Sequence, residues 1–137
     1  MGNVKQALSA ELASKLVDAA KAKAEEIGVP MCIAVVDDGG NLKALLRMDG
    51  SPLVAIEVSG DKAYTSAAQG ISTEVLAGVI EKDPPLTVSV PASPRITPVP
   101  GGFPVTVEGE LVGGLGVSGG YYTDDVKVGE AAIEAIS

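Results

Sequence analysis

Pro100-Gly101-Gly102-Phe103-Pro104 and Gly113-Gly114-Leu115-Gly116-Val117-Ser118-Gly119-Gly120 are two glycine-rich segments in the second half of this chain. The pattern predicts strands over residues 105–108 and 111–118, joined at Gly109. Glycine has no side chain, so other groups can approach its backbone closely. We therefore expect a hairpin whose glycine-rich backbone forms the floor of a pocket.

The length and composition of the chain predict one domain over residues 1–137. A chain of this length buries roughly two thirds of its unfolded surface in a single core. Hydrophobic residues make up 46% of the chain, and only 20% of its residues are charged. A chain this apolar is expected to bury part of its surface against copies of itself, so we expect a homo-oligomer.

Charge and targeting signals narrow the classes of partner. The formal net charge is -8, and the ten basic residues are scattered, which argues against nucleic acid and an anionic membrane surface. We find no apolar run long enough for a membrane span and no signal-peptide pattern. The single cysteine, Cys32, cannot form an internal disulfide. We expect a cytoplasmic protein that binds a small molecule.

The first half of the chain predicts a helix, a hairpin and two more helices. The first helix has Ser9 as its cap and ends at Gly28. Strands are predicted over residues 31–37 and 42–48, with a turn at residues 38–41. The second helix runs over residues 52–69, started by Ser51 and Pro52, and Gly60 within it permits close packing. A shorter helix follows Ser72 and runs to about Glu81.

The middle of the second half is crowded with proline. Seven prolines lie between residues 84 and 104, which predicts one long ordered loop without regular structure. A last helix begins at Thr123, where Asp124 and Asp125 suit the positive end of the helix dipole. This order of elements predicts an α+β fold with an antiparallel sheet and helices packed on its faces. Because alternation is weak in the strands, both faces of the sheet are expected to be covered.

Several motifs together carry a family resemblance that covers nearly the whole chain. They are Val29-Pro30, residues 35–42 (Val-Val-Asp-Asp-Gly-Gly-Asn-Leu), Arg47-Met48-Asp49-Gly50, Asp61-Lys62-Ala63, residues 100–104 and residues 114–119. In this order and spacing the chain resembles the GlcG and haem-degrading HbpS-like family. The resemblance implies a profilin-like domain with a central antiparallel sheet, assembled into oligomers. It also implies kinship with haem-binding proteins and with the C-terminal part of some corrinoid adenosyltransferases.

The chain departs from the haem-binding members of that family at a position that bears on the ligand. It has no histidine, and Asn41 stands after the double glycine where relatives can have one. Haem is therefore one possible cofactor and no more. Six side chains remain as possible axial ligands of the iron, and a structural role is preferred for each of them: Met31, Cys32, Met48, Tyr64, Tyr121 and Tyr122. A hydroxyl such as that of Thr65 is a further candidate for a place near a bound haem, but it would be a weak ligand.

Two cations are the candidates for holding an anionic ligand. Lys62 lies on the polar face of the second helix, where it can bind a carboxylate or phosphate or transfer a proton. The structural alternative is a lysine that is solvated or paired with Asp61 or another acid. Arg95 clamps a carboxylate with its fork, or fixes its loop through an ion pair. Gly101-Gly102 and Gly119-Gly120 present backbone N–H groups to an anion, or simply form turns. The full ligand-binding set predicted is Lys62, Thr65, Arg95, Gly101, Gly102, Phe103, Gly116 and Ser118, with Lys62 as the catalytic candidate.

Other motifs are set aside. Residues 114–119 fit a dinucleotide-binding pattern, but too few residues follow for a βαβ unit. Ser118 has no histidine partner for a hydrolase triad. Asp37 and Asp38 lie beside two glycines and are predicted to form a turn. No loop has the ligand spacing of a magnesium or calcium site, so no metal site is predicted.

Three functions remain open at this point. The first is binding of a small ligand, whether haem, a corrinoid or another anionic metabolite, in a cleft between the second helix, the proline-rich loop and residues 114–120. The alternative is a cofactor-free enzyme that catalyses proton transfer, isomerisation or elimination on an acidic metabolite, with Lys62 moving the proton. The third is an accessory subunit that serves assembly only.

Overall fold

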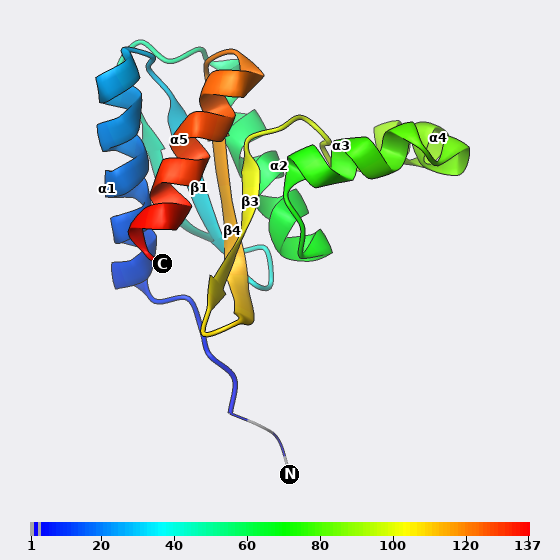
Figure 1. The fold of residues 1–137 in the computed structure, drawn as a ribbon, viewed down its shortest axis with the longest axis horizontal. Coiled ribbons are helices and arrows are strands. Elements are labelled where there is room, and N and C mark those ends of the chain that lie inside the picture. The colour runs from blue at the N-terminus through cyan, green and yellow to red at the C-terminus, as the bar shows by residue number, and fades with distance from the viewer. Residues whose placement is uncertain (1, 3) are drawn as a thin grey trace.

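The computed structural model describes residue 2 and residues 4–137, and its fold is α+β (Figure 1). In chain order the elements are α1 (Ala10–Ile27), β1 (Cys32–Asp37), β2 (Leu42–Arg47), α2 (Val54–Gln69), α3 (Thr73–Glu81), α4 (Pro84–Ala92), β3 (Gly102–Val107), β4 (Glu110–Ser118) and α5 (Tyr122–Ala135). The predicted fold class is confirmed. None of the helices in this described part is long and apolar enough to cross a membrane.

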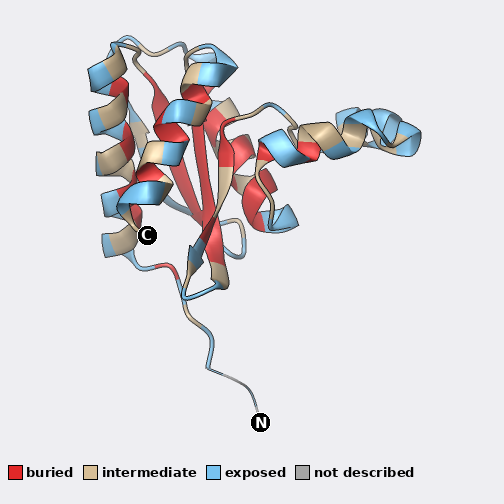
Figure 2. Ribbon diagram, viewed as in Figure 1, coloured by how far each residue is buried: buried red, intermediate tan, exposed pale blue. Residues whose placement is uncertain are grey.

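The four strands form one antiparallel sheet in the order β2-β1-β4-β3. The two hairpins, β1–β2 and β3–β4, meet through their inner strands. Both inner strands are buried along nearly their whole length, and Figure 2 shows them between layers of helix. Both faces of the sheet are therefore covered, as the weak alternation predicted.

The helices form two unequal layers on the sheet. α1 and α5 pack together on one face, where they cover the larger core, which includes Ile33, Val35, Leu115 and Val117. α2 alone packs on the other face, and the small core beneath it consists of Ala34, Val36, Ala63 and Ala67. Side chains alternate along β1, so Ile33 and Val35 belong to the larger core and Ala34 and Val36 to the smaller one.

Glycines on β4 explain how close α2 lies to the sheet. A Cβ atom on Gly114 would lie 2.1 Å from the carbonyl oxygen of Ala63, and one on Gly116 would lie 1.9 Å from that of Ser59. Real Cβ atoms do not approach backbone so closely, so no other residue fits at either position. The expectation of a glycine-lined pocket floor is corrected here, because helix backbone fills the space.

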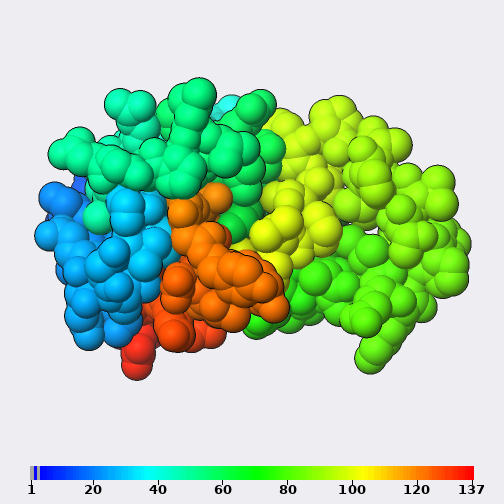
Figure 3. Space-filling model, turned by 90° about the horizontal axis from the view of Figure 1, so that it is seen from above, coloured from blue at the N-terminus to red at the C-terminus, as the bar shows by residue number. Residues whose placement is uncertain are grey.

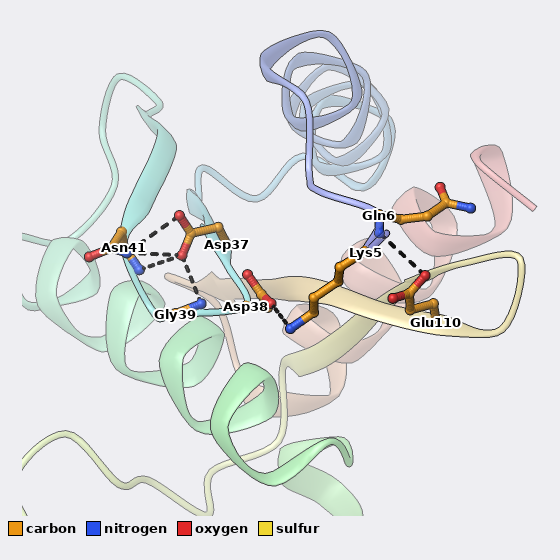
Figure 4. Close-up of polar contacts among 7 residues, drawn as sticks. All are labelled: Lys5, Gln6, Asp37, Asp38, Gly39, Asn41 and Glu110. Atoms are coloured by element: carbon orange, nitrogen blue, oxygen red, sulfur yellow. Dashed lines mark hydrogen bonds and ion pairs between the residues drawn. The ribbon is translucent and has the colours of Figure 1, made fainter. Parts of the chain in front are cut away.

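The predicted caps and turns of the first half are largely confirmed. The Ser9 hydroxyl accepts a hydrogen bond from the Leu12 amide at 3.0 Å, and α1 ends at Gly28, whose φ is 74°. In the β1–β2 turn, an Asp37 carboxylate oxygen accepts 2.9 Å bonds from the amides of Gly39 and Asn41 (Figure 4). Asp38 pairs with Lys5 in the same view. Asp37 thus stabilises the turn, and Asp38 links it to the segment before α1.

The proline-rich segment contains a helix, which corrects the prediction of an irregular loop. Pro84 and Pro85 occupy the first two positions of α4, where a missing N–H costs nothing and the fixed φ suits the helix. Pro91 comes at the end, within the last turn. Hydroxyls of Thr87 and Ser93 donate to carbonyl groups of the helix or its edge. α3 and α4 extend away from the body of the molecule, and we call α4 the arm (Figures 1 and 3).

Two elements begin more than one residue away from the predicted start. α2 begins at Val54 with no side-chain cap, because the Ser51 hydroxyl donates to the Met48 carbonyl oxygen instead. β3 begins at Gly102, three residues before the predicted start, and includes Pro104. Because β3 is an edge strand, a residue without an N–H is tolerated there.

Candidate functional site

A cavity of about 310 Å³ lies between α2 and the β1–β2 hairpin. We call it the Arg95 cavity. Its lining is apolar on the sheet side and mixed on the helix side: Ala34, Val36, Leu42, Leu45, Ile56, Glu57, Gly60, Asp61 and Arg95. Its size is at the small end of the range for ligand pockets, and it combines apolar walls with a few charged groups, as such pockets do.

The apolar wall follows from the register of the hairpin. Val36 pairs with Leu42 and Ala34 with Leu45, so these side chains share the face of the sheet that α2 covers. α2 does not extend over β2, and Leu42 and Leu45 remain 60% and 43% exposed. A neighbouring hollow lined by Leu53, Val54, Ile56 and Glu57 adjoins the cavity. The result is a connected apolar surface of the kind that marks binding sites.

Arg95 is the only cation in the lining, and several contacts fix its position. Its φ is 67°, a left-handed conformation that is costly for a residue other than glycine. Its carbonyl oxygen accepts a 3.0 Å bond from the buried Thr65 hydroxyl, which itself accepts one from the Thr97 amide. Its guanidinium lies 4.0 Å from the centre of the Tyr64 ring. Arg95 is therefore held at the cavity in a defined orientation before any ligand arrives.

Two carboxylates of α2 share the cavity with Arg95. Asp61 Oδ1 lies 3.7 Å from Arg95 Nε, and the two side chains are 30% and 48% exposed. Glu57 is one helical turn before Asp61 and is exposed. Partial burial raises the pKa of Asp61; the Arg95 charge opposes this effect and the Glu57 charge adds to it. The charged side of the cavity thus consists of one guanidinium and two carboxylates.

Gly60 faces the cavity and makes no close packing contact, which corrects the prediction. A Cβ atom built on Gly60 would have no atom within 4 Å. A glycine inside a helix costs about 1 kcal/mol relative to alanine, and close packing does not explain it here. Its position in the lining shows what the missing side chain does: it leaves room in the cavity.

Lys62 points away from this cavity, toward α5. Its Nζ donates to the Val117 carbonyl oxygen at 2.8 Å and to Asp125 Oδ2 at 2.9 Å, and its side chain is 1% exposed. Asp125 Oδ1 also accepts a bond from the Gly120 amide. Burial lowers the pKa of Lys62 and raises that of Asp125, while each partner opposes the effect on the other. The acid facing Lys62 is Asp125 and not Asp61, so Asp125 does more than complement the α5 dipole.

The glycine pairs serve this buried ion pair and the packing around it. A Cβ atom on Gly101 would lie 2.7 Å from Lys62 Nζ, and one on Gly102 would lie 2.5 Å from the Lys62 carbonyl oxygen. The Gly102 amide donates to the Thr73 hydroxyl and the Gly120 amide to Asp125. These two N–H groups, predicted as candidates for anion binding, are therefore engaged within the protein.

Of the eight predicted binding residues, Arg95 lines the cavity, and the Thr65 hydroxyl holds the backbone of Arg95 in place. Phe103 packs on α5, where a Cβ atom on Gly129 would lie 2.1 Å from its ring. Gly116 lies under α2, and Ser118 is buried at the end of β4. Lys62, Gly101 and Gly102 surround the ion pair. The cavity is thus on the β1–β2 side of α2, whereas the cleft was predicted on the side of residues 114–120.

The residues that complete the cavity were not predicted from the sequence as site residues. Glu57, Gly60 and Asp61 are spaced at i, i+3 and i+4, which places them on one face of a helix. That spacing, together with an unexplained helical glycine, is the signal that the sequence offered. The strand residues gave no such signal, because exposed and buried leucines look alike in a sequence.

Comparison with known proteins identifies relatives over almost the full chain. A family model described as "Haem degrading protein HbpS-like" matches residues 8–134. A 15.0 kDa Citrobacter freundii protein from the dhaT-dhaS intergenic region is 34% identical over 126 residues, which is 91% of this chain and 89% of that protein. Protein GlcG of Escherichia coli K12 is 35% identical over 111 residues, or 81% of each chain. The corrinoid adenosyltransferase PduO of Citrobacter freundii is 34% identical over 131 residues, 95% of this chain, which spans only 39% of PduO.

Solved structures share the fold. The crystal structure of a PduOC:haem complex superposes with a TM-score of 0.89 at 31% identity, and the alignment covers 96% of both chains. That of HbpS also gives a TM-score of 0.89 at 31% identity, over 99% of this chain and 94% of the other. The first of these structures is a complex with haem.

Proposed function

Because this chain belongs to the HbpS-like family, we propose that it binds a small, largely apolar molecule that carries a carboxylate, in the Arg95 cavity. The observation that carries this proposal is the fixed guanidinium at the edge of an apolar hollow. Apolar walls favour the body of such a ligand, and Arg95 offers a planar fork for its carboxylate. A ligand-binding role agrees with relatives whose names include haem.

For haem, the cavity offers an apolar wall to the ring and Arg95 to a carboxylate, but no ligand to the iron. The lining contains no histidine, cysteine, methionine or tyrosine, the side chains that usually hold haem iron. Thr65 is buried with its hydroxyl already engaged, and Cys32 is buried outside the lining. The proposal therefore places the recognition of a porphyrin in its apolar ring and its carboxylate.

The first prediction compares two porphyrins. We expect haemin and metal-free protoporphyrin IX to bind with dissociation constants within about threefold of each other, because no residue in the cavity favours the iron. Arg95→Gln should weaken both by about tenfold, the effect of losing one charge-assisted hydrogen bond. Absorbance titration near the Soret band measures haemin, and fluorescence measures protoporphyrin.

Lys127→Ala is the matched control, since it removes one positive charge from an exposed position on α5. It should leave both dissociation constants unchanged. Equal binding of both porphyrins by wild type and Arg95→Gln would contradict the proposed site. Tight binding of haemin alone would show that an iron ligand exists that the geometry does not reveal.

We further propose that the chain forms a homo-oligomer through the arm. No residue of α4 is buried, and Val88 is 76% exposed. No charged residue occurs between Asp83 and Arg95, in a chain with a net charge of -8. Like-charged copies repel, and an uncharged apolar projection is a surface on which they can meet.

Light scattering coupled to gel filtration tests this second prediction. Val88→Glu should lower the measured mass to that of the monomer, because it places a charge within the contact. Val4→Glu alters a fully exposed valine outside the arm and should leave the mass unchanged. A monomeric wild type, or a Val88→Glu oligomer of wild-type mass, would exclude the arm as the interface.

A further inference from the structure

We propose that Asp61 takes up a proton when an oxyanion binds to Arg95, so that the cavity holds apolar oxyanions more tightly as the pH falls. This inference rests on the proposed function and concerns how the same site is regulated. It follows from the placement of Asp61, Glu57 and Arg95 around one cavity.

In the free protein, Asp61 is already the counter-ion of Arg95, but the contact between the two groups is long. The single ion-pair contact runs from Arg95 Nε to Asp61 Oδ1 at 3.7 Å, beyond ordinary hydrogen-bond length. The guanidinium otherwise lies on the Tyr64 ring and is about half exposed. The fork of Arg95 is therefore available to a ligand, while the Asp61 charge remains beside it.

A bound oxyanion would bring a third negative charge to this cavity. It would sit on Arg95, close to the carboxylate of Asp61 and one helical turn from Glu57. Like charges in so small a space raise each other's pKa. A proton taken from solvent onto Asp61 removes the repulsion and turns that carboxylate into a hydrogen-bond donor for the oxyanion.

The groups that face Asp61 favour this protonation. From its own helix it faces Glu57, and from the segment after the arm it faces Arg95, which lies on the Tyr64 ring. The strands contribute only Ala34, Val36, Leu42 and Leu45 to the lining, none of which is ionisable. Partial burial raises the pKa of Asp61 even before a ligand arrives. A ligand anion shifts the pKa in the same direction, so binding and protonation reinforce each other.

The third prediction uses anilinonaphthalenesulfonate as the probe. Its sulfonate stays ionised, so the pH dependence reports the protein alone. Between about pH 8 and about pH 5, where folded proteins are generally stable, the wild-type dissociation constant should fall about tenfold. Asp61→Asn should bind about tenfold more tightly than wild type at the higher pH and show no pH dependence. Probe fluorescence gives both values.

Two controls separate this effect from general changes in the protein. N-phenylnaphthylamine has the same aromatic body without the sulfonate, and its binding should depend on neither pH nor Asp61. Calorimetry in phosphate and in Tris, whose ionisation enthalpies differ, counts protons directly. It should find uptake of up to about half a proton per bound sulfonate in wild type, the maximum that a tenfold linkage allows, and none in Asp61→Asn.

The outcomes distinguish this inference from the proposal beneath it. If Arg95→Gln weakens sulfonate binding but wild type shows neither pH dependence nor proton uptake, the role of Asp61 is wrong and the ligand site stands. If neither the sulfonate nor haemin binds, or if Arg95→Gln binds both as wild type does, the proposed function fails as well.

Discussion

Gly116→Ala should destabilise this protein by about 4 kcal/mol or more, close to the whole stability of a typical domain. The new Cβ atom would lie 1.9 Å from the Ser59 carbonyl oxygen and 2.6 Å from the Ala63 amide nitrogen. Both atoms belong to the backbone of α2, so no side-chain rotation relieves the overlap. The helix has to move off the sheet, and the small core beneath it opens.

Gly60→Ala is the matched control for this variant. It makes the same chemical change on the helix itself, at a position where the new atom meets nothing within 4 Å. It should raise the free energy of unfolding by up to about 1 kcal/mol, because alanine is the better helix former. Urea denaturation followed by circular dichroism measures both. If Gly116→Ala unfolds at the wild-type midpoint, α2 does not lie against β4 as closely as described.

Asp125→Ala should cost about 3–5 kcal/mol, the usual effect of removing one partner from a buried ion pair. Lys62 would keep only the Val117 carbonyl oxygen as a partner, in a place that is 1% exposed. Burial already lowers the pKa of Lys62, and without Asp125 nothing from that side opposes the effect. Between this lowered value and the ordinary 10.5, the unfolded chain binds more protons than the folded one. The stability of Asp125→Ala should therefore rise with pH over that window.

A double variant tests whether charge is the cause. Lys62→Met with Asp125→Asn removes both charges and keeps similar volumes, so it should recover most of the stability lost in Asp125→Ala. Unfolding curves of both variants at neutral and alkaline pH provide the comparison. A double variant as unstable as the single one would assign the loss to packing. A loss of less than about 1 kcal/mol in Asp125→Ala would mean that the pair is hydrated in solution.

Local sequence signals predicted most of the fold. Ser9 and Gly28 marked the ends of α1, the Asp37 to Asn41 turn separated two strands, and the order of elements indicated an α+β sheet covered on both faces. The arm was the exception. Prolines at residues 84 and 85 suit the first turn of a helix as well as a loop, and the density of prolines concealed that possibility.

The candidate site was harder to predict because it depends on long-range placement. Lys62 and Arg95 were both candidates for holding an anion, and only the packing of α2 shows that they lie on different sides of it. Glycines 101, 102 and 116 indicated close approach, but a sequence does not reveal whether ligand or helix backbone makes it. Asp61 stood in a family motif, yet its place beside Arg95 depends on a bond from the Thr65 hydroxyl to the Arg95 carbonyl oxygen, 30 residues further along the chain.

The way α2 is held has a consequence for how the site can adapt. Two contacts hold one side of this helix. Its backbone packs against the glycines of β4, and Lys62 pairs with Asp125 of α5. The opposite side of α2 forms a wall of the cavity, and these contacts hold that wall in place. Arg95 lies opposite that wall, on the segment between the arm and β3, and Thr65 and the Tyr64 ring tie it to the same helix. Both walls of the proposed site are thus tied to one helix, so the site is preorganised, and we expect it to select ligands by their fit to its existing shape.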